Sequence, residues 1–465
     1  MKQINNNRTK VIATIGPSSS GYDTLKEMIK NGVDVVRLNF SHGDYKDHKE
    51  TIINIRKISD ELELPISILQ DLQGPKIRVG KLNKDEIELI DGHQFFITSD
   101  DLIGNINEIS IDNDVIDDGK IELKVIGREK NKIRVEVIRG GILLQRKGVN
   151  LPESNIKLSS VTEKDIKDLL FGLENNVDWV ALSFVRSEDD IIHLRKLIKK
   201  NGFDTKIIAK IEKPQAIKNI DKIIANSDGL MVARGDLGVE MPMESVPIIQ
   251  KKIVYKCNLA CKPVIIATQM LESMISQKTP TRAESNDVAN AVLDGADAVM
   301  LSAESATGSY PLLAVESMNR IINSVEKTSD TIYYKFEKFK KLKDRVSESL
   351  ITTACRLSKQ ISAKAIVTMT KSGYSAFRVS GSRPKARIYI VTNDKKIGNV
   401  LNLVWGVRSI YYDKTENIDI TLENVESILL KNNHLSKNDK YIITSSMPTH
   451  WAGHTNMMKV NVVES

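Results

Sequence analysis

The chain has 465 residues, of which 41% are hydrophobic and 27% are charged, and its formal net charge is +7. This length predicts several domains, and no apolar run approaches the ~20 residues that a bilayer requires, so we expect no membrane span. Lysine and arginine are interleaved with aspartate and glutamate instead of forming a basic arm, which argues against a nucleic-acid-binding protein and is compatible with anionic metabolites.

The N-terminal segment and the cysteines bear on the compartment. MKQINNNRTK (1–10) is polar and lacks the long apolar region of an export signal, so the sequence predicts a cytoplasmic protein. Cys257, Cys261 and Cys355 form neither a disulfide framework nor a metal-binding spacing, and we expect buried free thiols.

Short apolar segments rich in β-branched residues recur along the chain, with helix-like segments between them. Such near-continuous hydrophobicity is typical of parallel strands that are buried on both faces. The strand–helix units in series predict an α/β fold with a closed (β/α)8 TIM barrel. The segments are KVIATIG (10–16), VDVVRLNF (33–40), SILQDL (67–72), WVALSFV (179–185), KIIAKIE (206–212), LMVARG (230–235), PVIIATQ (263–269) and AVMLSAE (298–304).

A stretch of different character interrupts this series, and we assign residues 73–159 to an inserted lid domain. Its segments, such as EIELI and KIRVEVIRGG, alternate apolar and polar residues and are separated by Asp-Gly and Gly-Gly pairs. This pattern predicts antiparallel hairpins in a small β-barrel-like domain. The catalytic barrel then comprises residues 1–72 and 160–335, and an insertion at its C-terminal rim could act as a lid.

A charged run that ends near residue 345 precedes a new α/β pattern. We therefore predict a third, C-terminal α/β regulatory domain over residues 336–465, with a mixed open sheet. Its apolar segments are KAIVTMT, ARIYIVTN, SIYYD, KYIITSS and MKVNVV.

The carboxyl ends of barrel strands carry the active site in folds of this kind, so polar residues there are candidates. Lys210 and Glu212 end one strand with a spacing of two, which points both side chains the same way, and Asp236 follows the next strand. Two carboxylates suit Mg²⁺, and the Lys210 ammonium, helped by Arg37, could neutralise a phosphoryl group in transfer. The sequence therefore predicts phosphoryl transfer at a divalent-metal site.

A structural interpretation of the same carboxylates stays open. Pairing of Glu212 and Asp236 with Arg234 or Lys213 would explain them equally well, because a buried charge needs a partner. The glycines that flank Asp236 in ARGDLG (233–238) permit a sharp turn, whose following helix could offer N–H groups to a substrate carboxylate. No GxxxxGK[ST] segment occurs, which excludes a P-loop nucleotide site.

These segments resemble the pyruvate kinase family. The resemblance spans the barrel, is looser in the other two domains, and implies transfer of a phosphoryl group from phosphoenolpyruvate to ADP, giving pyruvate and ATP in the last step of glycolysis. It also implies a homotetramer. The matching segments are TKVIATIGPSS, VVRLNFSHG, IAKIE, MVARGDLGVE, ATQMLESM and PTRAESNDVANAVLDGADAVMLSAESATGSYP.

Carried over residue by residue, the resemblance implies a role for each polar side chain at the barrel mouth. Lys210 would stabilise the phosphoryl group, which Arg37 would contact. Glu212 and Asp236 would bind Mg²⁺ or Mn²⁺, and the backbone of Gly235 and Asp236 would hold the substrate carboxylate.

The same resemblance implies residues for the proton and for the nucleotide. Thr268 would lie near the enolate face that must be protonated, and Ser302 would help to relay that proton. A second Mg²⁺ would arrive with ADP. The residues that would face the nucleotide phosphates are Asn39, Phe40, Ser41, His42 and Arg78.

One departure from the family concerns K⁺. Many members carry a glutamate where this chain has Lys76, whose ammonium can stand in for the charge of the ion. We therefore expect activity without K⁺. The positions that match the K⁺ site of the family are Asn39, Ser41, Asp71 and the carbonyl of Leu72.

TMTKSGYSAFRVSGSRP (368–384) resembles the loop with which the family binds an effector phosphate. Its hydroxyls and backbone nest could bind a sugar-phosphate or nucleotide effector, but a plain strand–turn–helix junction explains the same residues. The candidate effector residues are Thr370, Ser372, Gly373 and Ser375.

Two other classes of protein remain as alternatives. A metal-dependent aldolase or lyase on a similar barrel also holds Mg²⁺ and an enolate with carboxylates, although the inserted domain and NFSHG (39–43) favour phosphates. A barrel retained as a binding or regulatory scaffold is the non-catalytic alternative.

Overall fold

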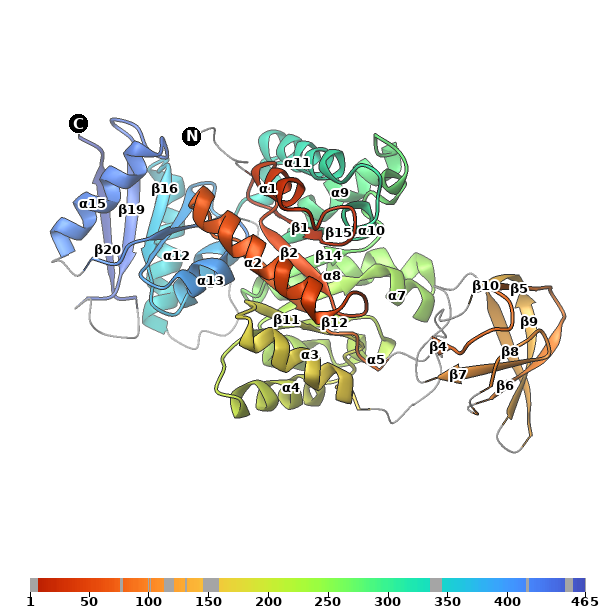
Figure 1. The fold of residues 1–465 in the computed structure, drawn as a ribbon. Coiled ribbons are helices and arrows are strands. Elements are labelled where there is room, and N and C mark those ends of the chain that lie inside the picture. Colours follow the sequence, from red (N-terminus) through yellow and green to blue (C-terminus); the bar gives the residue numbers. More distant parts are fainter. Residues whose placement is uncertain are drawn as a thin grey trace.

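The computed structural model describes residues 7–75, 78–98, 100, 102–112, 121–129, 132–144, 159–334, 345–414, 418–447 and 455–464. A central barrel has the C-terminal α/β unit on one side and the inserted β unit on the other (Figure 1). In the described residues, no helix combines the length and the apolar character that crossing a membrane requires.

Eight parallel strands close the barrel in the order β1-β15-β14-β13-β12-β11-β3-β2, which confirms the predicted (β/α)8 architecture. Each barrel strand thus lies beside the barrel strands that precede and follow it in the chain, and every predicted apolar segment overlaps one strand. The strands are β1 (Lys10–Thr14), β2 (Val35–Asn39), β3 (Ser67–Asp71), β11 (Trp179–Leu182), β12 (Lys206–Ile211), β13 (Gly229–Ala233), β14 (Val264–Ala267) and β15 (Ala298–Leu301).

Helix ends around the barrel follow local sequence signals. Thr162, Ser187 and Thr281 start α3, α4 and α9 with capping boxes, which satisfy N–H groups of the first turn. Gly295 ends α9 with a φ of 103°, a conformation that favours glycine. The helices and short 3-10 turns are α1 (Tyr22–Lys30), α2 (Tyr45–Leu62), α3 (Glu163–Glu174), α4 (Glu188–Lys200), α5 (Pro214–Lys218), α6 (Ile220–Asn226), α7 (Arg234–Glu240), η1 (Met243–Ser245), α8 (Val246–Leu259), η2 (Glu272–Ile275), α9 (Arg282–Asp294), α10 (Ala303–Ala306), α11 (Pro311–Thr328) and η3 (Asp330–Ile332).

The inward-facing rows of the strands change from apolar to polar toward the mouth of the barrel. Along β12 the row is Ile208 and Lys210, and Glu212 continues it directly after the strand, because alternate residues of a strand face the same side. Ile208 belongs to the apolar cluster at the base, which Leu403 of the C-terminal unit completes. The polar residues that end these rows therefore meet at one place.

Four aspartates tie the base of the barrel together, each directly preceding one of four alternate strands. Their carboxylates accept backbone N–H groups of the neighbouring strands at 2.7 to 3.0 Å. An arginine pairs with each carboxylate, which offsets the cost of burying the charge. The aspartates are Asp34, Asp178, Asp228 and Asp297.

The inserted unit contains a five-stranded sheet, β4-β7-β6-β9-β8, and a two-stranded sheet in which β5 pairs with β10. The prediction of antiparallel hairpins is right for β8 and β9 but wrong for β5 and β6, which lie in different sheets: β5 pairs with β10, and β6 pairs with β7 and β9. The strands are β4 (Arg78–Val79), β5 (Glu86–Leu89), β6 (Gln94–Thr98), β7 (Glu108–Asp112), β8 (Glu122–Glu129), β9 (Lys132–Arg139) and β10 (Gly141–Leu144).

The turns of the insert explain this difference. Asp91 and Gly92 join β5 to β6, and Gly140 joins β9 to β10, so both turns connect strands of different sheets. The N–H of Gly140 donates to Asp91 at 2.6 Å, and that of Gly92 donates to the carbonyl of Val137 at 2.7 Å. The two turns therefore support each other where the chain crosses between sheets, instead of reversing within one sheet.

The C-terminal unit has the predicted mixed open sheet, with strand order β18-β17-β16-β19-β20. β20 runs antiparallel to β19, and the other pairs are parallel. Its elements are α12 (Arg345–Gln360), β16 (Ala365–Met369), α13 (Tyr374–Gly381), β17 (Arg387–Thr392), α14 (Lys395–Leu401), β18 (Val407–Tyr411), α15 (Ile418–Lys431), β19 (Lys440–Ser445) and β20 (Met457–Val462).

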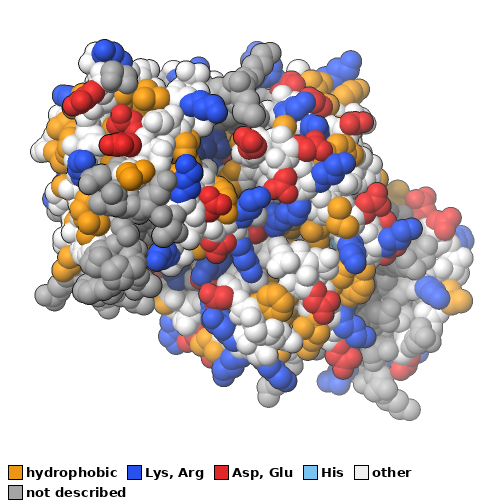
Figure 2. Space-filling view, turned by 60° about the vertical axis from the view of Figure 1, so that its left-hand side comes forward, with side chains coloured by type: hydrophobic (Ala, Val, Ile, Leu, Met, Phe, Trp, Pro, Cys, Tyr) orange, Lys and Arg blue, Asp and Glu red, His pale blue; other side chains and the backbone are white. Residues whose placement is uncertain are grey.

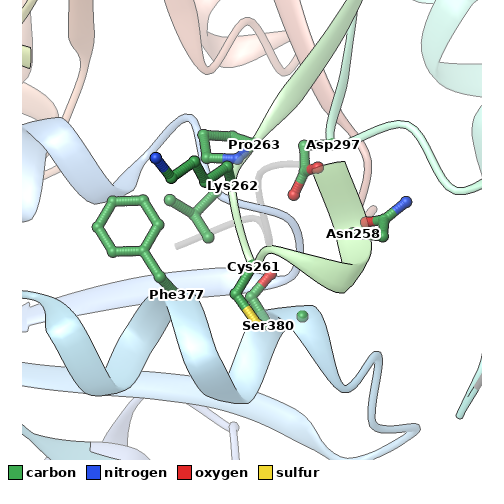
Figure 3. Close-up of a pocket in the computed structure, with 9 residues that line it drawn as sticks. Asn258, Cys261, Lys262, Pro263, Asp297, Phe377 and Ser380 are labelled. Atoms are coloured by element: carbon green, nitrogen blue, oxygen red, sulfur yellow. The ribbon is translucent and has the colours of Figure 1, made fainter. Parts of the chain in front are cut away.

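The C-terminal unit covers the base of the barrel through buried polar contacts. The guanidinium of Arg383 lies 3.0 Å from Asp297 and donates to the carbonyl of Gly295 at 2.8 Å. A small pocket lies at this junction, between the barrel segment around Cys261 and the helix that carries Phe377 (Figure 3).

On the molecular surface, positive and negative side chains are interspersed (Figure 2), as the sequence predicts.

Lys10 is a fully buried cation at the same junction. Its ammonium donates to the carbonyl of Val407 at 2.9 Å and lies 3.4 Å from Asp34. Burial, opposed by Asp34 and Glu326 and reinforced by Arg408, lowers the pKa of Lys10 to about 8. The folded state therefore loses this proton at a lower pH than the unfolded chain does.

This difference in pKa predicts a pH-dependent stability. Between pH 8 and pH 10.5 the unfolded chain binds more protons at Lys10 than the folded chain, so the contribution of Lys10 to stability rises with pH. We expect the free energy of unfolding, relative to that of Lys10→Met, to increase by up to about 3 kcal/mol across this window. Denaturant unfolding of both proteins at several pH values measures it, and a pH-independent difference would contradict the expectation.

Candidate active site

Lys210 lies between two carboxylates at the mouth of the barrel. Its ammonium is 3.1 Å from Asp71 and 3.0 Å from Glu212, and it donates to the hydroxyl of Ser183 at 2.7 Å. Burial opposes the charge of Lys210, but the two carboxylates outweigh it and raise its pKa above the ordinary value. Lys210 is therefore a permanent cation at neutral pH.

Arg37 adds a second cation to the same cluster. Its guanidinium donates to Asp71 at 2.8 Å and to the hydroxyl of Thr14 at 2.9 Å. Burial alone would raise the pKa of Asp71, but the charges of Lys210 and Arg37 outweigh burial and lower it. The structure thus places Arg37 and Lys210 on opposite oxygens of one carboxylate.

Glu212 is buried and is held by the backbone as well as by Lys210. The N–H of Phe184 donates to its second oxygen at 2.6 Å. Burial raises the pKa of Glu212, and the negative charge of Asp236 adds to this effect, whereas Lys210 opposes it. Two carboxylates thus act on one another across a buried site, and such a site favours an added cation.

The turn that follows β13 carries Gly235 and Asp236 at the start of α7. The N–H of Gly235 donates to the hydroxyl of Thr268 at 2.7 Å, and that hydroxyl donates to the carbonyl of Ala267 at 2.6 Å. Thr268 has a φ of 69°, a conformation that a β-branched residue rarely adopts. The structure therefore brings Thr268 and Gly235 together and holds Thr268 in a strained backbone conformation.

The alternative partners of the carboxylates are bound elsewhere. Lys213 pairs with Glu240, and Arg234 pairs with Asp287 at 2.7 Å while also donating to the carbonyl of Thr268. Neither cation pairs with Glu212, whose basic partner is Lys210. These contacts argue against a structural pairing of Glu212 with Lys213 or Arg234.

Ser302 follows β15 at the same rim. Its N–H donates to Glu304 at 2.7 Å, while its hydroxyl oxygen is buried and has no hydrogen-bond partner among the described residues. Glu304 also accepts the N–H of Leu271 at 3.2 Å, and burial raises its pKa. The Ser302 hydroxyl thus has hydrogen-bonding capacity that no described residue uses.

Four of the five predicted nucleotide residues are consecutive, with Asn39 ending β2 and Phe40, Ser41 and His42 following it. Asn39 accepts the N–H of Ser41 at 3.1 Å, His42 is exposed, and the ring of Phe40 stacks on His48 at 4.2 Å. Lys164 of α3 donates to the carbonyl of Phe40 at 2.7 Å. Of the predicted set, Arg78 lies apart in β4 of the insert.

Two of the four predicted K⁺ positions, Asp71 and Leu72, already make contacts within the chain. Asp71 binds Arg37 and Lys210, and the carbonyl of Leu72 accepts the hydroxyl of Ser183 at 2.7 Å. Lys76, on which the expected independence from K⁺ depends, lies outside the described residues.

The candidate effector residues form the turn between β16 and α13. The N–H of Gly373 donates to Thr370 at 3.0 Å, and the N–H of Tyr374 donates to Ser372 at 3.4 Å. The hydroxyl of Ser375 is buried and lies 2.8 Å from that of Thr455. Ser375 therefore already has a partner within the chain, unlike an open phosphate site.

The donor set fits a metal that keeps positions for substrate and water. Within the described parts of the chain, no group of three or more histidine, cysteine, aspartate or glutamate side chains could hold a metal by itself. Mg²⁺ in phosphate chemistry is typically bound by one or two carboxylates, with water and substrate completing its octahedron. Glu212 and Asp236 supply two carboxylates, the number that such a site needs.

Comparisons with known proteins agree with this geometry. Residues 6–315 match the family model "Pyruvate kinase, barrel domain", and residues 348–461 match "Pyruvate kinase, alpha/beta domain". The chain belongs to the pyruvate kinase family. It is therefore a phosphotransferase, and the resemblance of the sequence motifs to this family is confirmed.

Full-length relatives support the same assignment. A pyruvate kinase from Agrobacterium vitis is 42% identical over 98% of this chain and 97% of that protein. One from Clostridium acetobutylicum is 40% identical over 98% of this chain and 100% of that protein. One from Sporosarcina psychrophila is 39% identical over 98% of this chain and 80% of that protein.

Proposed function

We propose that this chain transfers the phosphoryl group of phosphoenolpyruvate to ADP, giving pyruvate and ATP, at the mouth of the barrel. The observation that carries the proposal is the buried ammonium of Lys210, 3.1 Å from Asp71 and 3.0 Å from Glu212. A fixed cation in a site of low dielectric stabilises the charge of a phosphoryl group without reorganisation during the reaction.

In this proposal Arg37 and Lys210 bind the phosphoryl oxygens, and Asp71 holds both cations in place. Glu212 and Asp236 bind Mg²⁺ or Mn²⁺, which neutralises negative charge on the substrate. The backbone of Gly235 and Asp236 binds the substrate carboxylate. The substrate thus meets cations at its phosphoryl group and backbone N–H donors at its carboxylate.

The enolate that phosphoryl transfer releases must then gain a proton. Thr268 lies at this face of the site, and its hydroxyl already exchanges hydrogen bonds with Gly235 and Ala267. Ser302, whose buried hydroxyl has no partner among the described residues, helps to relay the proton. Conversion of the enol to pyruvate makes ATP synthesis strongly downhill.

The nucleotide is assigned to the loop of Asn39, Phe40, Ser41 and His42, together with Arg78 and a second Mg²⁺. We propose that the insert (73–159) closes over this loop as a lid on the catalytic domain (1–72 and 160–335), and that residues 336–465 regulate it. We also propose that the enzyme acts in the cytoplasm as a homotetramer and that an effector phosphate binds at Thr370 and Ser372.

A coupled assay for pyruvate and ATP from phosphoenolpyruvate and ADP tests this function. Production of both in equal amounts, dependent on Mg²⁺ or Mn²⁺, supports it. Cleavage of an oxo-acid without ATP would support the lyase alternative, and no turnover of either kind would support a scaffold. Sugar phosphates and nucleotides added to the same assay test the effector site.

The same assay tests the requirement for K⁺. We expect turnover in K⁺-free buffer, because Lys76 brings its own positive charge to the position of the family's glutamate. Loss of nearly all activity there, with recovery on adding KCl, would contradict this. Lys76→Glu is the matched variant, and we expect it to make turnover dependent on K⁺.

A further inference from the structure

We propose that Lys213 is a positioning residue that holds the two carboxylates of the metal site at their working separation. This inference rests on the proposed function, because it takes Glu212 and Asp236 as the metal ligands. Lys213 directly follows Glu212 in the chain, and its ammonium pairs with Glu240, the last residue of α7. That helix begins at Arg234 and carries Asp236 in its first turn.

The Lys213–Glu240 pair joins the two segments that carry the ligands. Glu212 directly follows β12 and Asp236 lies in the first turn of α7, so the pair fixes the far end of α7 to the residue beside Glu212. The side chain of Glu240 is 2% exposed and that of Lys213 is 21% exposed. The second oxygen of Glu240 is buried and has no hydrogen-bond partner among the described residues, so Glu240 depends on Lys213.

Lys213 also supports Glu212 through Phe184. Its ammonium lies 5.7 Å from the centroid of the Phe184 ring, and the N–H of Phe184 donates to Glu212 at 2.6 Å. Phe184 has a φ of 53°, which a phenylalanine rarely adopts and which surrounding contacts must maintain. One of these contacts is Gly74, where an added Cβ would lie 3.0 Å from the Phe184 ring.

The positive charge of Lys213 and its positioning contact are expected to change metal affinity in opposite directions. A lysine beside a metal site repels the metal, so removing its charge alone should strengthen metal binding. Loss of a positioning contact should weaken it, because groups that orient metal ligands are typically worth about 10- to 100-fold in affinity or activity. The sign of the change therefore separates the two effects.

The experiment titrates the full-length enzyme with Mn²⁺, without substrate, and follows binding by electron paramagnetic resonance. We expect Lys213→Met to raise the Kd for Mn²⁺ at least about tenfold, and Lys213→Arg to restore it to within a few fold of the wild type. Glu240→Gln should weaken binding as Lys213→Met does, and the double variant should be no weaker than either single variant. Glu240→Gln and Lys213→Arg also keep the inference testable if Lys213→Met does not fold.

Arg195→Met is the matched control, because Arg195 pairs with Asp228 at 2.8 Å at the opposite end of the barrel. It should lower Tm without changing the affinity for Mn²⁺. An unchanged or tighter Kd in folded Lys213→Met overturns the inference, whatever its Tm. If Glu212 and Asp236 are not the metal ligands, the result is distinguishable, because wild type and Glu212→Gln would then bind Mn²⁺ equally.

Discussion

Replacing Lys210 with methionine is expected to reduce turnover by about a thousandfold or more, because the phosphoryl group loses a buried cation that is preorganised for it. Arg37 remains, but Asp71 and Thr14 hold its guanidinium at a different position, so it cannot move into the place of Lys210. The rate of pyruvate formation at saturating phosphoenolpyruvate, ADP and Mg²⁺ measures the effect. Mn²⁺ should still bind, since Glu212 and Asp236 are retained.

Lys206→Met is the matched control for this variant. Lys206 starts the same strand, β12, at the end opposite the site, so its loss should leave turnover within about twofold. Thermal unfolding should show that both variants are folded. A folded Lys210→Met protein that retains more than a tenth of the turnover would contradict the assigned role of Lys210.

The mouth of the barrel was predictable because residue spacing along a strand fixes which side chains point inward. Lys210 and Glu212 follow this spacing on β12, and so does Ser183, two residues beyond Ala181 of β11. Ser183 was not predicted as a site residue, although the same spacing points it inward. Asp71 was predicted only as a K⁺ position, because spacing does not reveal that two cations share its carboxylate.

Other features of the site depend on contacts between distant segments. The positive φ of Phe184 has no signal in the sequence, since contacts with Gly74, Lys213 and Glu212 hold it. The strained backbone of Thr268 is similar, because Arg234 and Gly235 bind it from another strand end. Propensity alone would place neither residue in the left-handed region.

The architecture was predictable where neighbours in the chain are neighbours in space. Each barrel strand pairs with the next one, so periodicity and length were sufficient. In the insert, β5 pairs with β10, and more than fifty residues of sequence separate the two strands. The Asp-Gly and Gly-Gly turns therefore did not predict which strands pair. The four aspartates of the barrel base stand in the pairs VD, VD, SD and AD, directly before alternate strands, but no role was predicted for them.

Replacing Arg383 with methionine is expected to lower the free energy of unfolding by about 3 to 5 kcal/mol, because it leaves Asp297 buried without its cation. Both side chains are at most 5% exposed, and the guanidinium also lies 4.7 Å from the Trp405 ring. Denaturant unfolding measures the loss. Lys385→Met is the control, because Lys385 and Asp330 form an exposed pair, 63% and 84% accessible, whose removal should cost at most about 1 kcal/mol.

The double variant Arg383→Met with Asp297→Asn shows whether the cost comes from the uncompensated charge. Two nitrogens of Arg383, Nε and Nη1, are buried without hydrogen-bond partners among the described residues, so the native pair is itself imperfectly satisfied. Removing both charges should therefore recover most of the loss, since replacing a whole buried pair is often nearly neutral. If the double variant is less stable than Arg383→Met alone, Asp297 stabilises the barrel base chiefly through the N–H groups of Val264 and Trp405.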